Sequence, residues 1–298
     1  MRRSIVLELR KTRRLRTLLA SLVAAVAALS CLSLFASSTR ESLDDPQASP
    51  WAALLLTYTF MAAMTSPLLT AVLASRQTDI EHSGQGWVLA ATAGHSPGRL
   101  CRAKLATLAL LLLPAVAAQS GLVVAAGVLA GIRVPLDTGS WVGYTVLLYL
   151  LDVAFCALHI WLAARVDNQL VSVGVGTLGS FLAVFSLLMP SGLSRLVPWG
   201  YYAIISHAGQ EGDRVSYVSA PYGWVAGFLL LVAVVFTLVT RRLDRVDKVG
   251  CPCCAQSSPS SGGPAPGSSR SSCPSWQSSP ARSTSCATRT PSAPGGSR

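Results

Sequence analysis

Six apolar segments, each long enough to cross a lipid bilayer, limit the possible folds of this sequence more than any other feature. A hydrocarbon core of about 30 Å requires about 20 helical residues. The segments cover residues 17–36, 51–73, 105–130, 141–164, 170–190 and 222–240. A helix pairs its backbone polar groups within the segment, whereas an open strand in lipid cannot. The sequence therefore predicts an all-α, polytopic membrane protein with six transmembrane helices.

The composition argues against a soluble protein. Of the 298 residues, 51% are apolar and 12% are charged, whereas soluble domains average about 25% charged residues. The net charge of +11 would suggest nucleic-acid binding in a soluble protein. In a membrane protein the basic residues are first interpreted as signals of orientation, and no nucleic-acid partner is predicted.

The positions of the basic residues predict that both termini lie in the cytosol. Short cytosolic loops are enriched in Lys and Arg. With the N-terminus inside, sixteen basic residues are cytosolic: seven before residue 17, four in 74–104, Arg165 and four in 241–248. The other side holds four. The first apolar run is also longer than the roughly 7–15 residues of a signal peptide's apolar region, so we expect a retained first helix.

The last 48 residues differ in composition from the rest of the chain. From Cys251 onward, 28 residues are Ser, Pro or Gly, none is acidic, and five of the eight cysteines are present. Such a segment buries too little apolar surface to offset the entropy of ordering it, which predicts disorder. An out-of-frame reading of the gene would also explain it. The predicted organisation is a basic interface helix (1–16), a six-span domain (17–250) and a disordered tail (251–298).

No sequence motif points to catalysis by this chain. The Walker A and H-E-x-x-H motifs are missing, and the G-x-S-x-G sequence at Gly94–Gly98 does not follow a predicted strand, as a nucleophile elbow would require. The cysteines of the tail have no second paired Cys or His element at the spacing that zinc sites use. We therefore predict no catalytic residue, no metal site and no cofactor bound by this chain.

The loop predicted between the second and third segments, residues 74–104, combines features of a docking element. The stretch that begins at Trp87 suits a short helix on the membrane surface, which would end at Gly94 in the C-cap position. Ser96 and Pro97 then suit the N-cap and the first position of the next helix. A merely solvated loop is the alternative, but it would not need these features.

The order of residues in this loop resembles a known family. It reads Leu73-Ala-x-Arg76, Glu81, Trp87, Leu89, Gly94, Ser96 and Ala103-Lys104-Leu105. It looks like the stretch between the second and third spans of ABC-2-type transporter permeases, particularly those of lantibiotic immunity and export systems. In that family the stretch holds a coupling helix that docks on a separate ATPase. The resemblance covers about residues 1–250 and implies an ATPase-coupling role for Arg76, Asp79, Glu81, Trp87, Leu89, Gly94, Ser96 and Lys104.

The resemblance implies the permease subunit of an ATP-driven exporter in a bacterial plasma membrane. A cytosolic ABC ATPase subunit would bind ATP and Mg²⁺, and a second permease subunit would complete a homo- or heterodimer. The implied cargo is an amphipathic antimicrobial peptide or another lipophilic molecule. Two alternatives stay open, namely a non-transporting membrane scaffold or sensor component and an intramembrane enzyme.

Three polar residues interrupt the predicted spans. Asp152 lies in the middle of the fourth, His159 follows two turns later on nearly the same face, and Gln119 lies in the third. A charge at this depth is costly unless it faces protein or water. They are candidates for a substrate path or an interhelical pair, and the alternative is that Asp152 is protonated or satisfied by a neighbouring helix.

Small residues line one part of the fifth span, where they let another helix approach closely. They are Gly174, Gly176, Gly179 and Ser180. The partner could be internal or a second protomer. The family resemblance further implies that the connection after this span, residues 191–221, dips partly into the membrane, although aromatic anchoring at the headgroups would also explain its composition.

Overall fold

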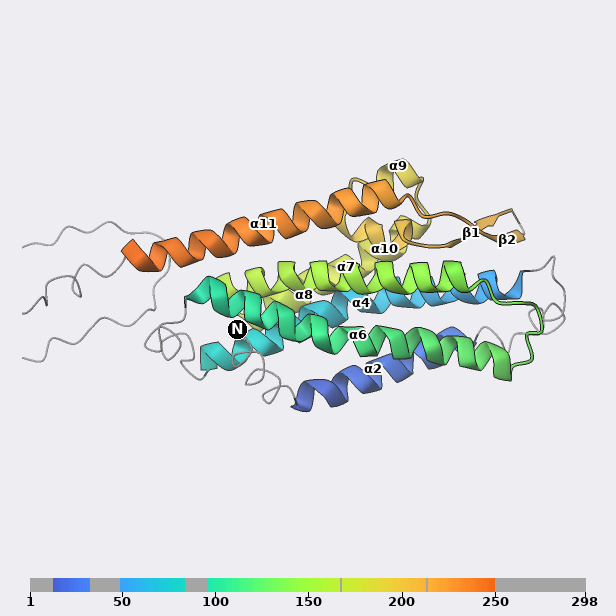
Figure 1. Cartoon of the computed structure of the whole chain (residues 1–298), viewed down its shortest axis with the longest axis horizontal. Coiled ribbons are helices and arrows are strands. Elements are labelled where there is room, and N and C mark those ends of the chain that lie inside the picture. Colours follow the sequence, from blue (N-terminus) through green and yellow to red (C-terminus); the bar gives the residue numbers. More distant parts are fainter. Residues whose placement is uncertain (1–12, 33–48, 84–95, 167, 213, 250–298) are drawn as a thin grey trace, which may run out of the picture. The chain divides into compact units, whose positions relative to one another are not determined.

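The computed structural model describes residues 13–32, 49–83, 96–166, 168–212 and 214–249 (Figure 1). The chain divides into two units, Met1–Pro252 and Cys253–Arg298, and the described residues all belong to the first. The predicted tail (251–298) and most of the predicted interface helix (1–16) lie outside the described residues.

Six long helices make up most of the described chain, as the apolar segments predict. They are α2 (Arg13–Leu32), α4 (Pro50–Ser83), α6 (Pro97–Leu129), α7 (Thr138–Arg165), α8 (Gln169–Leu187) and α11 (Tyr222–Val249). Among the described residues, five helices are long and apolar enough to cross a membrane, and the apolar part of α2, Leu19–Leu32, is shorter. The mostly helical fold and five helices of membrane-spanning length and composition are thus confirmed, while the sixth span stays a prediction.

Three of these helices extend well beyond the apolar segments; the start of α6 at Pro97 was predicted from its capping residues, and the extensions of α4 and α11 were not. α4 continues to Ser83, α6 begins at Pro97, and α11 continues to Val249. Hydropathy marks only the part of a helix that lipid can cover, whereas polar residues such as Arg, Gln and Glu sustain a helix in water. Much of the predicted loop 74–104 is therefore helical, and its central residues, 84–95, lie outside the described part.

Capping residues explain where several helices begin. Ser96 has extended backbone angles and is followed by Pro97, which confirms the predicted start of α6. At the start of α7, the Asp137 carboxylate accepts hydrogen bonds from the Ser140 hydroxyl (2.6 Å) and the Gly139 amide (3.1 Å). The Ser140 hydrogen bond is the main reason that the pKa of Asp137 lies below its usual range.

α4 occupies the centre of the helix packing. It contacts α2, α7 and α8, while α6 contacts α2, α7 and α11. Large side chains of α4 are fully buried, among them Leu54, Leu55 and Tyr58. α11 instead leaves many apolar side chains exposed, such as Leu230 at 67% and Leu231 at 60%. This exposed face is what a helix at the lipid boundary requires.

The connection between α8 and α11 contains short elements. They are α9 (Ser191–Ser194), η3 (Pro198–Gly200), α10 (Tyr201–Ile204) and an antiparallel hairpin of β1 (Ala208–Glu211) and β2 (Arg214–Tyr217). Gly212 in the hairpin turn has φ = 61°, a left-handed conformation that favours glycine. His207 Nε2 lies 2.8 Å from the Tyr222 hydroxyl, which joins the hairpin to the start of α11. These strands were not predicted from the sequence.

Candidate functional site

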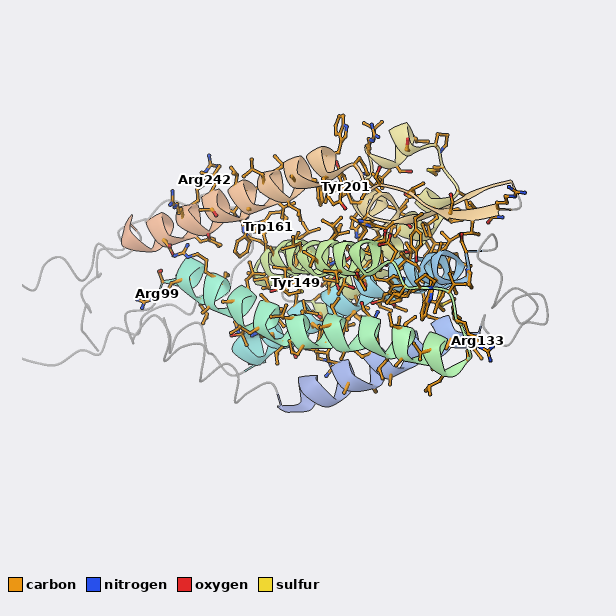
Figure 2. All side chains as sticks on the ribbon, turned by 45° about the vertical axis from the view of Figure 1, so that its right-hand side comes forward. Arg99, Arg133, Tyr149, Trp161, Tyr201 and Arg242 are labelled. Atoms are coloured by element: carbon orange, nitrogen blue, oxygen red, sulfur yellow. The ribbon has the colours of Figure 1, made fainter. Side chains whose placement is uncertain are left out.

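The end of α4, the start of α6 and the end of α11 meet at one end of the helices (Figure 1). Figure 2 shows Arg99 and Arg242 at this end and Arg133 at the opposite end. The segment predicted to dock on an ATPase joins α4 to α6 at the same end. We name this set of helix ends the coupling end.

α6 and α11 approach each other closely at the coupling end. Arg102 Nη2 donates to Asp244 Oδ2 at 2.8 Å, and the two side chains are 30% and 22% exposed. Nearby, a Cβ atom on Gly98 would overlap the backbone oxygen of Thr240 and the Asp244 carboxylate. The pair of helices is therefore joined by an ion pair and by a backbone contact that only glycine permits at residue 98.

Lys104 joins α6 to α4. Its side chain is fully buried, and Nζ donates to the backbone oxygen of Gln77 at 2.8 Å. Lys104 thus lies on the helix that begins at Pro97, as predicted, but with its side chain inside the bundle. The buried ammonium group bonds α6 to α4, and the implied role of Lys104 in ATPase coupling stays a prediction.

The structure distributes the other predicted coupling residues over this end of the chain. Arg76 is exposed on α4, Asp79 is half-buried on the same helix, and Ser96 is half-buried at the start of α6. Glu81 belongs to the last turns of α4, without a described side chain. Trp87, Leu89 and Gly94 lie outside the described residues.

Asp152 is buried within the helices and bonded to the segment after α8. It is 1% exposed, and its Oδ1 accepts a hydrogen bond from the Tyr202 hydroxyl at 2.8 Å. Asp152 is fourteen residues into α7, which is about 21 Å along the helix. The Tyr202 side chain therefore reaches the middle of α7, while the entry of residues 191–221 into the membrane, which the resemblance implied, stays a prediction.

An aromatic cluster fixes the same segment against α7. The Phe155 ring, which lies nearly one turn after Asp152, stacks on Trp199 at 5.8 Å and on Tyr202 at 5.3 Å between ring centroids. Gly179 of α8 faces the Trp199 indole so closely that a Cβ atom would overlap it. The segment after α8, which contains η3 and α10, is thus packed between α7 and α8.

His159 and Gln119 are also buried, each in a different environment from Asp152. His159 is 0% exposed, its Nδ1 lies 3.1 Å from the Ser172 hydroxyl of α8, and its Nε2 has no hydrogen-bond partner. Gln119 is 5% exposed and interacts with the Tyr58 hydroxyl. The three predicted path residues therefore do not meet in one site, and all are closed off in this structure.

A chain of hydroxyl groups near Gln119 was not predicted from the sequence. The Ser120 hydroxyl lies 3.0 Å from that of Tyr58 and accepts a hydrogen bond from Thr145 at 2.9 Å. It links α4, α6 and α7 through buried polar contacts. Hydroxyls within apolar segments are too common to mark such a network in a sequence.

The small residues of α8 contact different neighbours. A Cβ atom on Gly176 would overlap Ala71 and approach the Pro67 oxygen of α4, whereas a Cβ atom on Gly174 would meet nothing within 4 Å. Ser180 donates to the Gly176 oxygen at 3.2 Å. The contact of Gly176 is internal to the chain, and the position of Gly174 is open.

A comparison with protein families identifies one match. Residues 4–184 match the family described as ABC-2 family transporter protein. The match covers more than half of the chain, including α2, α4, α6, α7 and most of α8, and it contains the α4 and α6 parts of the coupling end. No curated protein matches the chain.

Proposed function

Because the chain belongs to the ABC-2 family of transporter proteins, we propose that it is the permease subunit of an exporter that a separate ABC ATPase drives. The single observation that carries this proposal is the family match over the first four described spans and α2. ATP and Mg²⁺ are bound by the ATPase subunit, and this chain binds neither. A second permease subunit completes the transporter in the plasma membrane, with both termini of each subunit in the cytosol.

The contacts at the coupling end support a route from the ATPase to the spans. Residues 84–95 join α4 to α6, and a force on this segment acts first on the starting turns of α6. Lys104 passes the displacement to α4 through Gln77, and Arg102 passes it to α11 through Asp244. Binding and hydrolysis of ATP then shift the population between inward-open and outward-open arrangements.

The proposed cargo is an amphipathic antimicrobial peptide, such as a lantibiotic, or another lipophilic molecule. The buried positions of Asp152, His159 and Gln119 support a path that opens only when the spans rearrange. In an open state, the Asp152 carboxylate would attract a cationic peptide. The Asp152 carboxylate would become accessible when the Tyr202 hydroxyl no longer donates to it.

The direct test is copurification of the tagged chain with the ATPase encoded beside its gene. The double variant Glu81→Ala/Trp87→Ala should lose about tenfold or more of the bound ATPase, because interface anchors of this kind carry a large share of binding energy. Arg214→Ala, in the hairpin at the opposite end, is the control and should retain it. Undiminished ATPase in the double variant would refute the assigned docking segment.

A growth assay tests the cargo separately. Cells that express the chain together with its ATPase should survive higher lantibiotic concentrations than cells in which the ATPase lacks its phosphate-binding lysine. Equal survival would remove the peptide cargo from the proposal and leave the ATPase partnership intact.

A further inference from the structure

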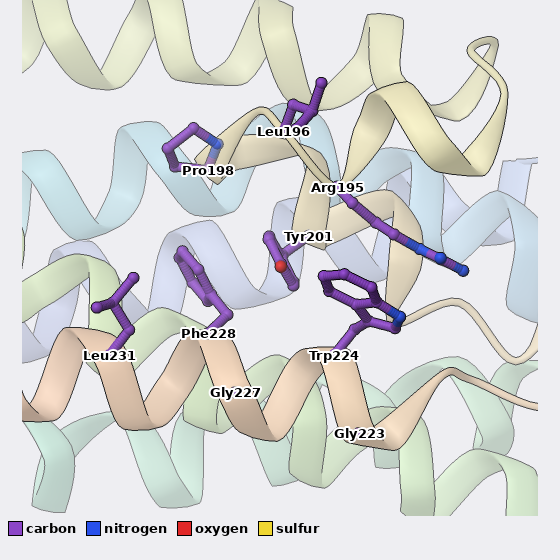
Figure 3. Close-up of a pocket in the computed structure, with 9 residues that line it drawn as sticks. All are labelled: Arg195, Leu196, Pro198, Tyr201, Gly223, Trp224, Gly227, Phe228 and Leu231. Carbon is purple, nitrogen blue, oxygen red and sulfur yellow. The ribbon is translucent and has the colours of Figure 1, made fainter.

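A cavity of about 550 Å³ lies between the segment after α8 and the first turns of α11 (Figure 3). Its walls are mainly apolar, with Tyr201 and Phe228 stacked at 4.1 Å between ring centroids. Leu231 extends the apolar wall one turn further along α11. The cavity is thus an elongated apolar hollow beside the exposed face of α11.

Two glycines form the floor of this hollow. Gly223 and Gly227 are four residues apart and therefore share one face of α11. A Cβ atom on either would meet nothing within 4 Å. Open space above both positions shows that no other part of the described chain fills the hollow.

Arg195 supplies the one cation among the lining residues, and it lies at the end of the hollow nearer the hairpin. The Arg195 guanidinium lies 5.1 Å from the centroid of the Trp224 ring, and Figure 3 shows its side chain extending past that indole. Its Nε atom is buried without a hydrogen-bond partner. No Asp or Glu is among the residues that line the cavity, so an anion would meet no repulsion from its walls.

This arrangement matches the chemistry of a lipid. Guanidinium groups bind phosphate oxygens through charge-assisted hydrogen bonds, often two at once. Trp side chains prefer the depth of the lipid headgroups, with acyl chains below them. Trp224 is 57% exposed, and the neighbouring face of α11 carries the exposed Leu230 and Leu231, so the hollow opens where lipid would cover the protein.

We propose that this hollow binds one anionic phospholipid from the leaflet nearer the hairpin. The lipid phosphate binds Arg195, and an acyl chain lies over Gly223 and Gly227 against Phe228 and Leu231. The lipid contacts both the segment after α8 and α11, and it fills the space between them that protein atoms leave empty. This site depends on the membrane location of the chain and not on the cargo or on the ATPase.

Native mass spectrometry of the full chain in mild detergent tests the site. The protein is titrated with phosphatidylglycerol and with phosphatidylcholine, and wild type should retain phosphatidylglycerol preferentially. Arg195→Gln should weaken phosphatidylglycerol retention about tenfold, the loss expected for one charge-assisted hydrogen bond. Arg195→Lys should keep part of the retention, and Arg214→Gln, which removes an exposed hairpin arginine, should keep all of it.

A second pair of variants tests the apolar floor without touching the charge. Gly227→Leu fills the hollow and should displace the lipid, whereas Gly174→Leu places the same side chain at an open position on α8 and should not. A single monodisperse peak in size-exclusion chromatography establishes that each variant folds. Wild-type retention in both Arg195→Gln and Gly227→Leu would overturn the proposal. An equal loss in Arg214→Gln, or equal retention of both lipids by wild type, would do the same.

Discussion

Asp152 illustrates what a single residue does in this chain. A carboxyl group in the middle of a span is expensive unless a partner is available, and its position alone made it a candidate in the sequence. Its partner, Tyr202, is fifty residues away in a segment of short helices. Only the folded chain reveals that this pair joins α10 to α7.

Removal of the Tyr202 hydroxyl should therefore destabilise the protein. Tyr202→Phe keeps the stack on Phe155 but leaves an Asp152 oxygen without its donor, at a cost of about 1–3 kcal/mol. The measurement is thermal unfolding of the purified protein in detergent. Tyr201→Phe, at the adjacent position, keeps its stack on Phe228 and should unfold close to wild type. Equal unfolding temperatures for the two variants would mean that the hydrogen bond contributes nothing.

Several elements of the bundle approach each other closely at glycine residues. The glycine pattern in the fifth apolar segment predicted a packing face on α8, and the structure shows which glycines contact α4 and which do not. The pattern could not assign the partner, because small residues suit any neighbouring helix. The same limitation hid the contact of Gly98 with α11.

Two glycines of α8 provide a matched pair for this packing. Gly176→Ala forces a methyl group against Ala71 and should destabilise the protein by about 1–3 kcal/mol through overpacking. Gly174→Ala meets open space and should be neutral or stabilising by up to about 1 kcal/mol, because alanine is the better helix former. Unfolding temperatures of the two variants measure the difference. A destabilised Gly174→Ala variant would show that a second subunit covers this position.

The ion pair between α6 and α11 can be tested by exchange of its charges. Arg102→Asp brings two carboxylates together and should cost about 0.5–1 kcal/mol, a modest value because solvent screens both side chains. Arg102→Asp/Asp244→Arg should recover most of the stability, and it should also recover ATP-driven transport if the pair transmits motion. Recovery of stability without transport would limit the pair to a structural role.

At the scale of the whole molecule, hydropathy predicted the helical fold because lipid imposes one length on every span. It misplaced three helix ends, since the polar extensions of α4, α6 and α11 leave no hydropathy signal, although the capping residues Ser96 and Pro97 did predict the start of α6. It also gave no sign of the hairpin, although Gly212 between two polar residues is a turn signal. The residues that meet at the coupling end are too far apart in sequence for any local pattern to pair them.

Membrane orientation is the prediction at this scale. In a variant without its eight cysteines, a cysteine introduced at Arg214 should react with an impermeant maleimide in intact cells. A cysteine introduced at Arg242 should react only after permeabilisation. An N-terminal tag should likewise resist added protease until the cells are permeabilised, and its cleavage in intact cells would mean that α2 does not cross the membrane.

α11 is bonded to its neighbours near both of its ends, and Phe228, between these ends, stacks on Tyr201. His207 contacts Tyr222 at its first residue, and Arg102 binds Asp244 near its last turns. With 28 residues, it is a stiff rod about 42 Å long. A tilt imposed at one end must therefore displace the other end, so a displacement of α11 at the coupling end should reorient the β-hairpin at the opposite end of the helix.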